Sequence, residues 1–249
     1  MRVLKAFSVV EEFIKRRDGF LKNLTEETNL KNYFVNSTFA ILVFSAVYGA
    51  TMGIYSGGLQ IVYSAIKIPI LLLVSFYLTV PSYYVLSLLL GGKGTLGQTV
   101  VLLLSSFTIM SAVLIALVPV NLFFIITTTK SSTTYAFTVL LNIAIFALGG
   151  FFTLAYFIKG AETLYREPSE NWKPAFLLGS IILMFVGTQL AWVLRPYFNY
   201  YPSFIRPLES NFYTAVIELS LQFGSGVVSA FLILGFLAIA LLFARMFIK

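Results

Sequence analysis

Long, uninterrupted runs of apolar residues dominate the chain from residue 32 onward, and short polar stretches separate them. A helix needs about 20 apolar residues to cross the ~30 Å hydrocarbon core of a bilayer. The runs are continuous and do not alternate with polar residues, which excludes a membrane β-barrel. The pattern therefore predicts an all-α, polytopic bundle with six membrane spans, at about 33–55, 69–90, 97–119, 135–158, 174–194 and 226–247.

Glycine and proline residues predict where these spans begin, bend and end. Gly57 and Gly58 follow the first span, and residues 59–67 predict a short interfacial helix that ends just before Pro69. Pro81 predicts a kink inside the second span, because proline lacks the backbone N–H that a helix needs. The third span is expected to end at Pro119, before a connection over 121–134 that is rich in Thr and Ser.

The first 31 residues have a different pattern and form the only extended charged segment. Apolar residues recur there at helical spacing, while acidic and basic residues occupy the other side; the apolar stripe is Val3, Phe7, Val10 and Ile14, widened by Leu4, Phe13, Phe20 and Leu21. This pattern is typical of an amphipathic helix that lies on a membrane surface. Docking of a soluble partner is the alternative. We expect a cytoplasmic arm over 1–31 and a membrane domain over 32–249.

Composition supports a membrane protein. Hydrophobic residues make up 59% of the chain and charged residues 11%, against roughly 45–50% and about 25% in soluble domains. The chain has no Cys and no His, which excludes disulfides, thiolate nucleophiles, imidazole bases and ordinary zinc sites. We expect no catalytic, cofactor-binding or metal-binding residues. The Gly91-Gly92-Lys93-Gly94 sequence is interpreted as a turn, because it lacks the spacing of a phosphate-binding loop.

The net charge of +7 is explained by where the basic residues lie. Six spans place both termini on one side, and 13 of the 17 Lys and Arg residues then fall on that side. Basic residues are enriched on the cytoplasmic face of membrane proteins. The sequence therefore predicts cytoplasmic termini and a location in the bacterial inner membrane, with the lipid bilayer and protein subunits as partners and no role for nucleic acid.

The longest connection is predicted between the fifth and sixth spans, on the extracytoplasmic side. It is rich in aromatic residues and prolines over 197–223. One interpretation is an interfacial aromatic belt, since Tyr and Trp favour the headgroup level. The other is a lid held by ion pairs, for which the candidate residues are Lys67, Arg195, Arg206, Glu209 and Glu218.

Small and polar residues within the spans suggest where helices pack together. Gly49 and Gly53 share one helix face and allow a close approach. Gly149 and Gly150, in the middle of the fourth span, are further candidates for helix packing. The polar side chains expected at membrane depth are Gln98, Asn142, Gln189 and Gln222. Such amides are interpreted as hydrogen-bonding partners between helices, and a transport pathway is the alternative.

Several short stretches give a family resemblance. They are Ser56-Gly-Gly-Leu-Gln60 with Ser64-Ala-Ile-Lys67-Ile-Pro69, then Gly187-Thr-Gln189-Leu-Ala-Trp192-Val-Leu-Arg195-Pro196, Phe204-Ile-Arg206-Pro207 and Asn211-Phe212-Tyr213. Over about residues 40–220 the chain resembles uncharacterised bacterial polytopic proteins loosely grouped as Yip1-like. The resemblance implies a cytoplasmic N-terminus before a bundle of spans, with five spans expected against the six counted, and it implies no activity.

These observations favour a non-catalytic membrane subunit that anchors or organises a larger assembly. This interpretation is based on the absence of a catalytic constellation, the small-residue helix faces and the amphipathic arm. A small transporter or channel is the alternative, lined by Gln98, Asn142, Gln189 and nearby Ser and Thr. A lipid-active enzyme using Glu209 or Glu218 is a further alternative, although neither acid has an evident partner base.

Overall fold

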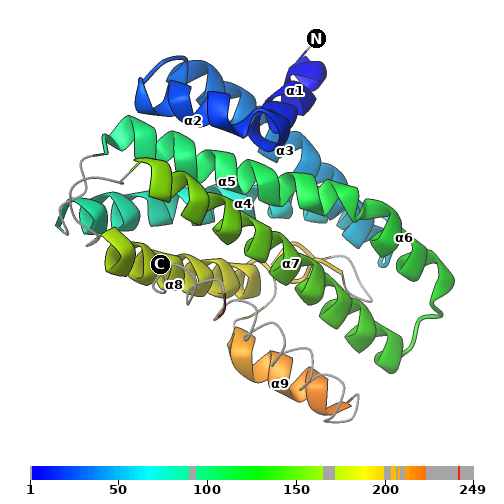
Figure 1. Ribbon diagram of the computed structural model, residues 1–249. Coiled ribbons are helices and arrows are strands. Elements are labelled where there is room, and N and C mark those ends of the chain that lie inside the picture. The colour runs from blue at the N-terminus through cyan, green and yellow to red at the C-terminus, as the bar shows by residue number, and fades with distance from the viewer. Residues whose placement is uncertain are drawn as a thin grey trace.

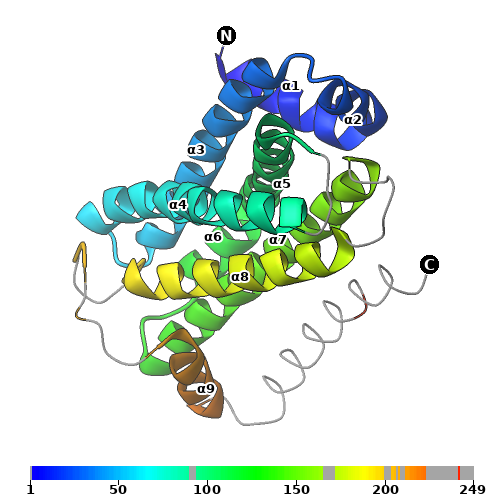
Figure 2. The same cartoon turned by 90° about the vertical axis from the view of Figure 1, so that its left-hand side faces the viewer.

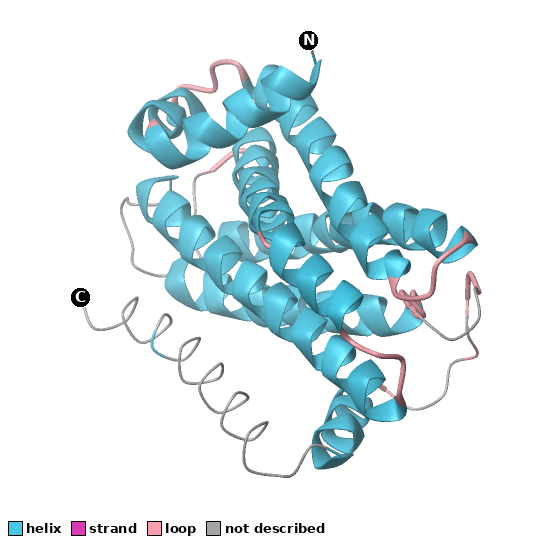
Figure 3. Ribbon diagram, turned by 90° about the vertical axis from the view of Figure 1, so that its right-hand side faces the viewer, coloured by secondary structure: helices cyan, strands magenta, loops and turns pink. Residues whose placement is uncertain are grey.

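In the computed structural model, the described part of the chain consists of helices joined by loops and turns, as Figures 1 and 3 show. The described residues are 2–89, 94–164, 172–198, 203–205, 207, 211–222 and 241. Their helices, in chain order, are α1 (Arg2–Lys15), α2 (Arg17–Thr25), α3 (Leu30–Ile54), α4 (Leu59–Leu89), α5 (Leu96–Ala116), α6 (Val118–Thr127), α7 (Ser132–Leu164), α8 (Trp172–Val193) and α9 (Phe212–Gln222).

Five stretches within the described ranges are long and apolar enough to cross a membrane. They are Leu30–Ile54, Leu59–Leu89, Leu96–Thr127, Ser132–Leu164 and Phe176–Val193. Large apolar side chains on these helices remain exposed, among them Leu42, Leu78, Leu148, Phe152 and Ile181, as expected of surfaces in contact with lipid tails. The chain is thus an integral membrane protein. The sixth predicted span, 226–247, lies outside the described residues except for Leu241.

Helices α1 and α2 lie together at one end of the bundle, which we call the arm end (Figures 1 and 2). The opposite end, where α3 ends and α4 begins, is called the far end. The chain breaks between α1 and α2 at Arg16, whose φ and ψ of −116° and 36° are not helical. The arm therefore consists of two short helices, whereas the pattern predicted one.

The arm buries one apolar face against the bundle and leaves another exposed. Ala6, Val9 and Phe13 of α1 are buried, followed by Phe20, Leu21 and Leu24 in α2. The Phe13 ring lies 6.0 Å from that of Tyr33 in α3. By contrast, Leu4 and Ile14 are 74% and 62% exposed. The buried face of α1 is thus offset by one residue from the predicted stripe, because Ala6, Val9 and Phe13 face the bundle.

Helix α4 is not divided near Pro69, contrary to what the sequence pattern predicted. The structure shows one helix from Leu59 to Leu89 that contains both Pro69 and Pro81, where a separate interfacial helix over 59–67 was predicted. Residues of that first part pack inside the bundle: Gln60, Ser64 and Lys67 are all fully buried. The prediction of a separate helix was wrong because Pro69 does not end it, and the Lys67 ammonium group finds a partner within the protein.

The prediction that the third span ends at Pro119 was also wrong. The chain makes a break at Leu117 and continues as α6, with Pro119 in its first turn. Proline fits that position because the first backbone N–H groups of a helix have no partner within it. The connection therefore begins only after Thr127.

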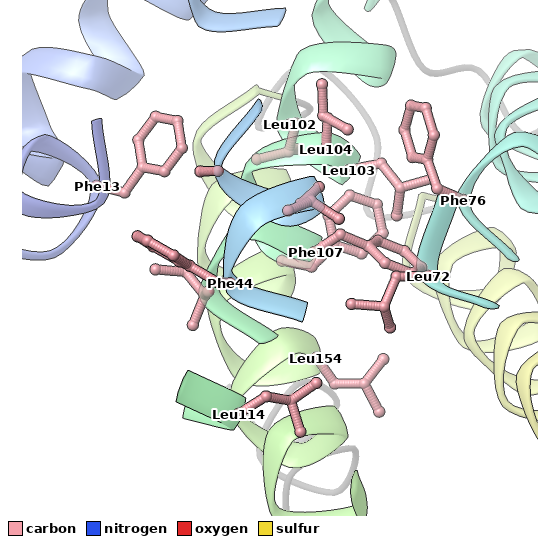
Figure 4. Packing of buried hydrophobic residues seen from close by; sticks show 14 of the residues in the cluster. Phe13, Phe44, Leu72, Phe76, Leu102, Leu103, Leu104, Phe107, Leu114 and Leu154 are labelled. Atoms are coloured by element: carbon pink, nitrogen blue, oxygen red, sulfur yellow. The ribbon is translucent and has the colours of Figure 1, made fainter. Parts of the chain in front are cut away.

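The core lies where α3, α4, α5 and α7 meet, and Figure 4 shows its packing. Phe44, Phe76, Leu103 and Phe107 are almost completely buried there. The Phe76 and Phe107 rings lie 5.9 Å apart, in an edge-to-face arrangement that is favourable for aromatic pairs. This core fixes the helices that carry the polar contacts described below.

Candidate functional site

Lys67 is the most unusual charged residue of the bundle, because it is fully buried within α4. Its Nζ atom donates a hydrogen bond of 2.7 Å to the carbonyl oxygen of Pro196. The same ammonium group lies 5.1 Å from the centre of the Phe204 ring and 6.0 Å from that of Tyr197. Aromatic faces attract cations, so these rings replace part of the stabilisation that water gives to an exposed ammonium group.

Two more residues of α4 hold the same segment. Gln60 Nε2 donates to Pro196 O at 2.8 Å, and Gln60 Oε1 accepts from the backbone N–H of Ser203 at 3.0 Å. The Ser64 hydroxyl donates to the carbonyl oxygen of Tyr197. Gln60, Ser64 and Lys67 occupy one helix face at i, i+4 and i+7. We call these three residues the α4 clamp, because together they hold the backbone that follows α8.

Aromatic side chains of that segment pack onto the far end of the bundle. Phe198 is buried, with its ring 5.8 Å from that of Tyr55 and 5.7 Å from that of Tyr135. Burial raises the pKa of the Tyr197 phenol above its ordinary value, and its hydroxyl donates to Ala191 O at 3.1 Å. In contrast, the Phe204 and Ile205 side chains are exposed.

The predicted ion-pair candidates lie in different settings. The Arg195 guanidinium stacks 3.5 Å from the centre of the Trp192 ring, and its Nη2 atom donates to Pro207 O at 3.2 Å. Glu218 is exposed on α9. Arg195 and Glu218 line one cavity, while Lys67 is directed to the backbone and rings described above. The other two candidates, Arg206 and Glu209, lie outside the described residues, and the ion-paired lid stays a prediction.

Asn142 lies at the centre of a buried hydrogen-bond network that joins α3, α6 and α7. Its Oδ1 accepts from the Tyr48 hydroxyl at 2.7 Å, and its Nδ2 donates to Asn121 Oδ1 at 3.2 Å and to Thr138 O at 2.9 Å. Asn121 Nδ2 in turn donates to Thr51 Oγ1 at 3.2 Å. Because lipid offers no hydrogen-bonding partners, such a network fixes how these helices pack.

Gln98 forms hydrogen bonds between helices at the arm end. It forms a capping box with Thr95 at the start of α5. Its side-chain Nε2 also donates to the carbonyl oxygens of Leu24 and Thr25, at 3.2 and 3.1 Å, where α2 ends. Of the other predicted amides, Gln189 is partly buried on α8, and the Gln222 side chain lies outside the described part of the chain.

The predicted glycine faces differ sharply in their surroundings. A Cβ atom at Gly53 would lie 2.5 Å from Gln60 O, and one at Gly49 would lie 2.8 Å from the carbonyl carbon of Ser64. The backbones of α3 and α4 therefore touch at these two residues. A Cβ at Gly149 would meet Met110 Cγ at 3.4 Å, while one at Gly150 would meet no atom within 4 Å.

Gly150 faces free space because it lines a cavity of about 600 Å³. This α7–α8 cavity lies mainly between α7 and α8, with contributions from α3, α4, α5 and α9. Its lining is largely apolar, and its polar members are Ser75, Asn142, Thr153, Thr188, Arg195 and Glu218. Within the described ranges, no group of three His, Cys, Asp or Glu side chains is placed to hold a metal ion.

Three residues of these contacts were not predicted from the sequence. Gln60 and Ser64 were assigned to a surface helix, and Asn121 was assigned to a connecting loop. Their spacing was nevertheless informative, since Gln60, Ser64 and Lys67 share one face of a largely apolar helix. Polar residues aligned in this way on a span indicate a protein contact and not a lipid contact.

Comparisons with models of protein families, with curated proteins and with solved structures find no significant match to this chain. The resemblance to Yip1-like proteins therefore stays a prediction.

Proposed function

We propose that this chain is a non-catalytic integral membrane subunit that anchors or organises a larger membrane assembly. The observation that supports the proposal most is that buried polar side chains of the spans bind the extramembrane segment at each end. At the far end the α4 clamp binds the backbone at Pro196, Tyr197 and Ser203. At the arm end Gln98 binds the last carbonyl groups of α2.

The arm is held by a further contact. The Tyr33 hydroxyl of α3 donates to the Glu12 carboxylate in α1 and accepts a hydrogen bond of 2.9 Å from Asn23 Nδ2 in α2. Both arm helices are thereby fixed to the first span. A segment held in this way presents its charged surface in a constant position, which a subunit needs in order to bind a partner without a large loss of conformational entropy.

The proposed topology has six spans, with the arm and the C-terminus in the cytoplasm of a bacterial cell and the α4 clamp near the extracytoplasmic surface. The excess of basic residues at the arm end supports this orientation. In this arrangement the exposed apolar side chains of α1, Leu4 and Ile14, face the headgroups of the inner leaflet, and the charged side of the arm faces the cytoplasmic partner.

Photo-crosslinking in native membranes tests the proposal. A photoreactive amino acid at exposed Asp18 in the arm is expected to give a discrete adduct with one protein, in near-stoichiometric amount. The same amino acid at Leu148, which is 44% exposed on α7, is the lipid-facing control. Gln98→Leu is expected to reduce the Asp18 adduct by releasing α2. An Asp18 probe that gives only adducts with a second copy of the chain would contradict the proposal.

A small transporter is the second candidate, favoured by the α7–α8 cavity and its polar lining residues. It would be supported by solute flux in liposomes that contain the purified chain alone. Under the subunit proposal, purified chain in sealed liposomes is expected to be inactive in such an assay.

A further inference from the structure

The α7–α8 cavity has dimensions suited to a long apolar chain. It extends along α7 from Tyr135 to Leu154, which is about 28 Å at the ~1.5 Å rise per residue of an α-helix. That length is comparable with the ~30 Å hydrocarbon core of a bilayer. Its volume of about 600 Å³ also falls within the roughly 300–1,000 Å³ of small-molecule sites.

Charge is confined to one end of this cavity. Among the described residues that line it, Arg195 and Glu218 are the only charged ones, and both lie toward the far end. The arm-end part is formed mainly by apolar side chains, including Leu72, Phe107 and Leu183, and its polar groups are the uncharged hydroxyls of Ser75 and Thr153. A cavity with one charged end and an apolar remainder is complementary to a molecule with a polar head and an apolar tail.

We propose that the α7–α8 cavity binds one phospholipid-like amphiphile with a zwitterionic headgroup. Its acyl chain lies between α7 and α8, its phosphate group faces Arg195, and its ammonium group faces Glu218. A guanidinium group suits the phosphate because its planar N–H donors match two oxygens at once. Stacking on Trp192 fixes the orientation of the guanidinium at the rim.

Gly150 offers a way to block the cavity without touching its charged end. A Cβ atom there would meet nothing within 4 Å, and the residue lines the cavity. The side chain of a Gly150→Phe variant therefore occupies the space that the acyl chain needs. Leu148→Phe is the matched control, because Leu148 lies on the same helix, is exposed to lipid and is not part of the lining.

The experiment uses the full-length chain in phosphatidylglycerol nanodiscs that contain a small fraction of phosphatidylethanolamine with a diazirine in one acyl chain. After illumination, mass spectrometry is expected to find label on lining residues such as Met110 and Met184. Gly150→Phe should reduce that labelling at least about fivefold, which corresponds to ~1 kcal/mol of binding free energy. Leu148→Phe should leave it unchanged. Equal labelling of both variants would mean that only bulk lipid is sampled, and would overturn the proposal.

The headgroup is tested by competition in the same nanodiscs. Replacing part of the phosphatidylglycerol with unlabelled phosphatidylethanolamine should displace the probe more than replacing it with phosphatidic acid, which has the phosphate but no ammonium group. Glu218→Gln should remove this preference, and Arg195→Gln should weaken displacement by both lipids. If neither substitution changes the competition, the headgroup assignment is wrong. If cysteines at Met184 and within 226–247 crosslink efficiently and block labelling, the chain's own last apolar segment occupies the cavity and the proposal fails.

Discussion

The Lys67 ammonium group and the Pro196 carbonyl oxygen lie 2.7 Å apart, although the two residues are 129 positions apart in the chain. The same carbonyl oxygen also accepts a hydrogen bond from Gln60. Two buried side chains of α4 therefore share one backbone acceptor just beyond the end of α8. This contact joins the second span to the segment after the fifth, and it can be tested one residue at a time.

Gln60→Leu should release this segment from α4. The substitution removes the hydrogen bonds to Pro196 and Ser203 and leaves a backbone N–H without its partner, at a cost of about 1–3 kcal/mol. A cysteine at Ser203, in a chain that has no native cysteine, should then react faster with a maleimide. Gln189→Leu is the matched control, since the described structure shows no side-chain hydrogen bond for Gln189. Equal reaction rates in the two variants would show that the clamp does not hold the segment.

Gly53→Ala should destabilise the protein, because even one methyl group would collide with the α4 backbone at Gln60. Overpacking of this kind costs about 1–3 kcal/mol, and it should lower the melting temperature in detergent. Gly150→Ala is the control on another span: it has free space and gains roughly 0.5–1 kcal/mol of helix propensity. A Gly53→Ala variant as stable as Gly150→Ala would mean that α3 and α4 can move apart at no cost.

The Tyr48–Asn142 hydrogen bond should show energetic coupling in a double-mutant cycle. Tyr48→Phe and Asn142→Leu each remove it, and hydrogen bonds within membrane proteins contribute about 0.6 kcal/mol on average and up to ~1.7 kcal/mol. We expect the double variant to be less destabilised than the sum of the single ones. Tyr77→Phe, at a residue that is 55% exposed, should have no effect on stability. Strict additivity would exclude a direct contribution of this bond.

Releasing the arm should not prevent insertion of the spans. Gln98→Leu removes two hydrogen bonds to the end of α2, which should increase cleavage of the arm by an added protease at low enzyme concentration. The membrane-embedded core should remain protected. Thr163→Leu, at an exposed position of α7, is the control. Loss of insertion in Gln98→Leu would show that the arm is required for assembly of the bundle.

The six-span topology can be tested with single cysteines. Cysteines at Ser169 and Ser203 should react with a membrane-impermeant maleimide from opposite sides of sealed vesicles, because the two positions flank the fifth span. Reaction from the same side would refute the six-span arrangement and the orientation derived from its basic residues.

The apolar pattern was sufficient to predict the helical class and the approximate position of five spans, because bilayer thickness sets the minimum length of an apolar spanning helix. It failed at Pro69 and at Pro119, where helices continue. Proline is compatible with a helix when its missing N–H falls in a first turn or when neighbouring helices support the bend. Neither condition can be recognised in a single sequence.

The polar contacts were harder to predict than the spans. Gln98 and Asn142 were expected to be polar residues at membrane depth, but their partners, the end of α2 and Tyr48, are 73 and 94 residues away. Lys67 was interpreted only as a candidate for the ion pairs of the lid. Its burial depends on Pro196, Tyr197 and Phe204 together, and no local pattern indicates that such a group will form.

The contact between Lys67 and Pro196 has a consequence for biosynthesis. Lys67 enters the membrane with the second span, but its acceptor is made only after three further spans have been synthesised. During that interval the ammonium group lies on a spanning helix without the carbonyl oxygen and rings that later surround it. A chain that stops before residue 196 therefore leaves this ammonium group without its carbonyl acceptor at the far end of the second span, which distinguishes it from the completed protein.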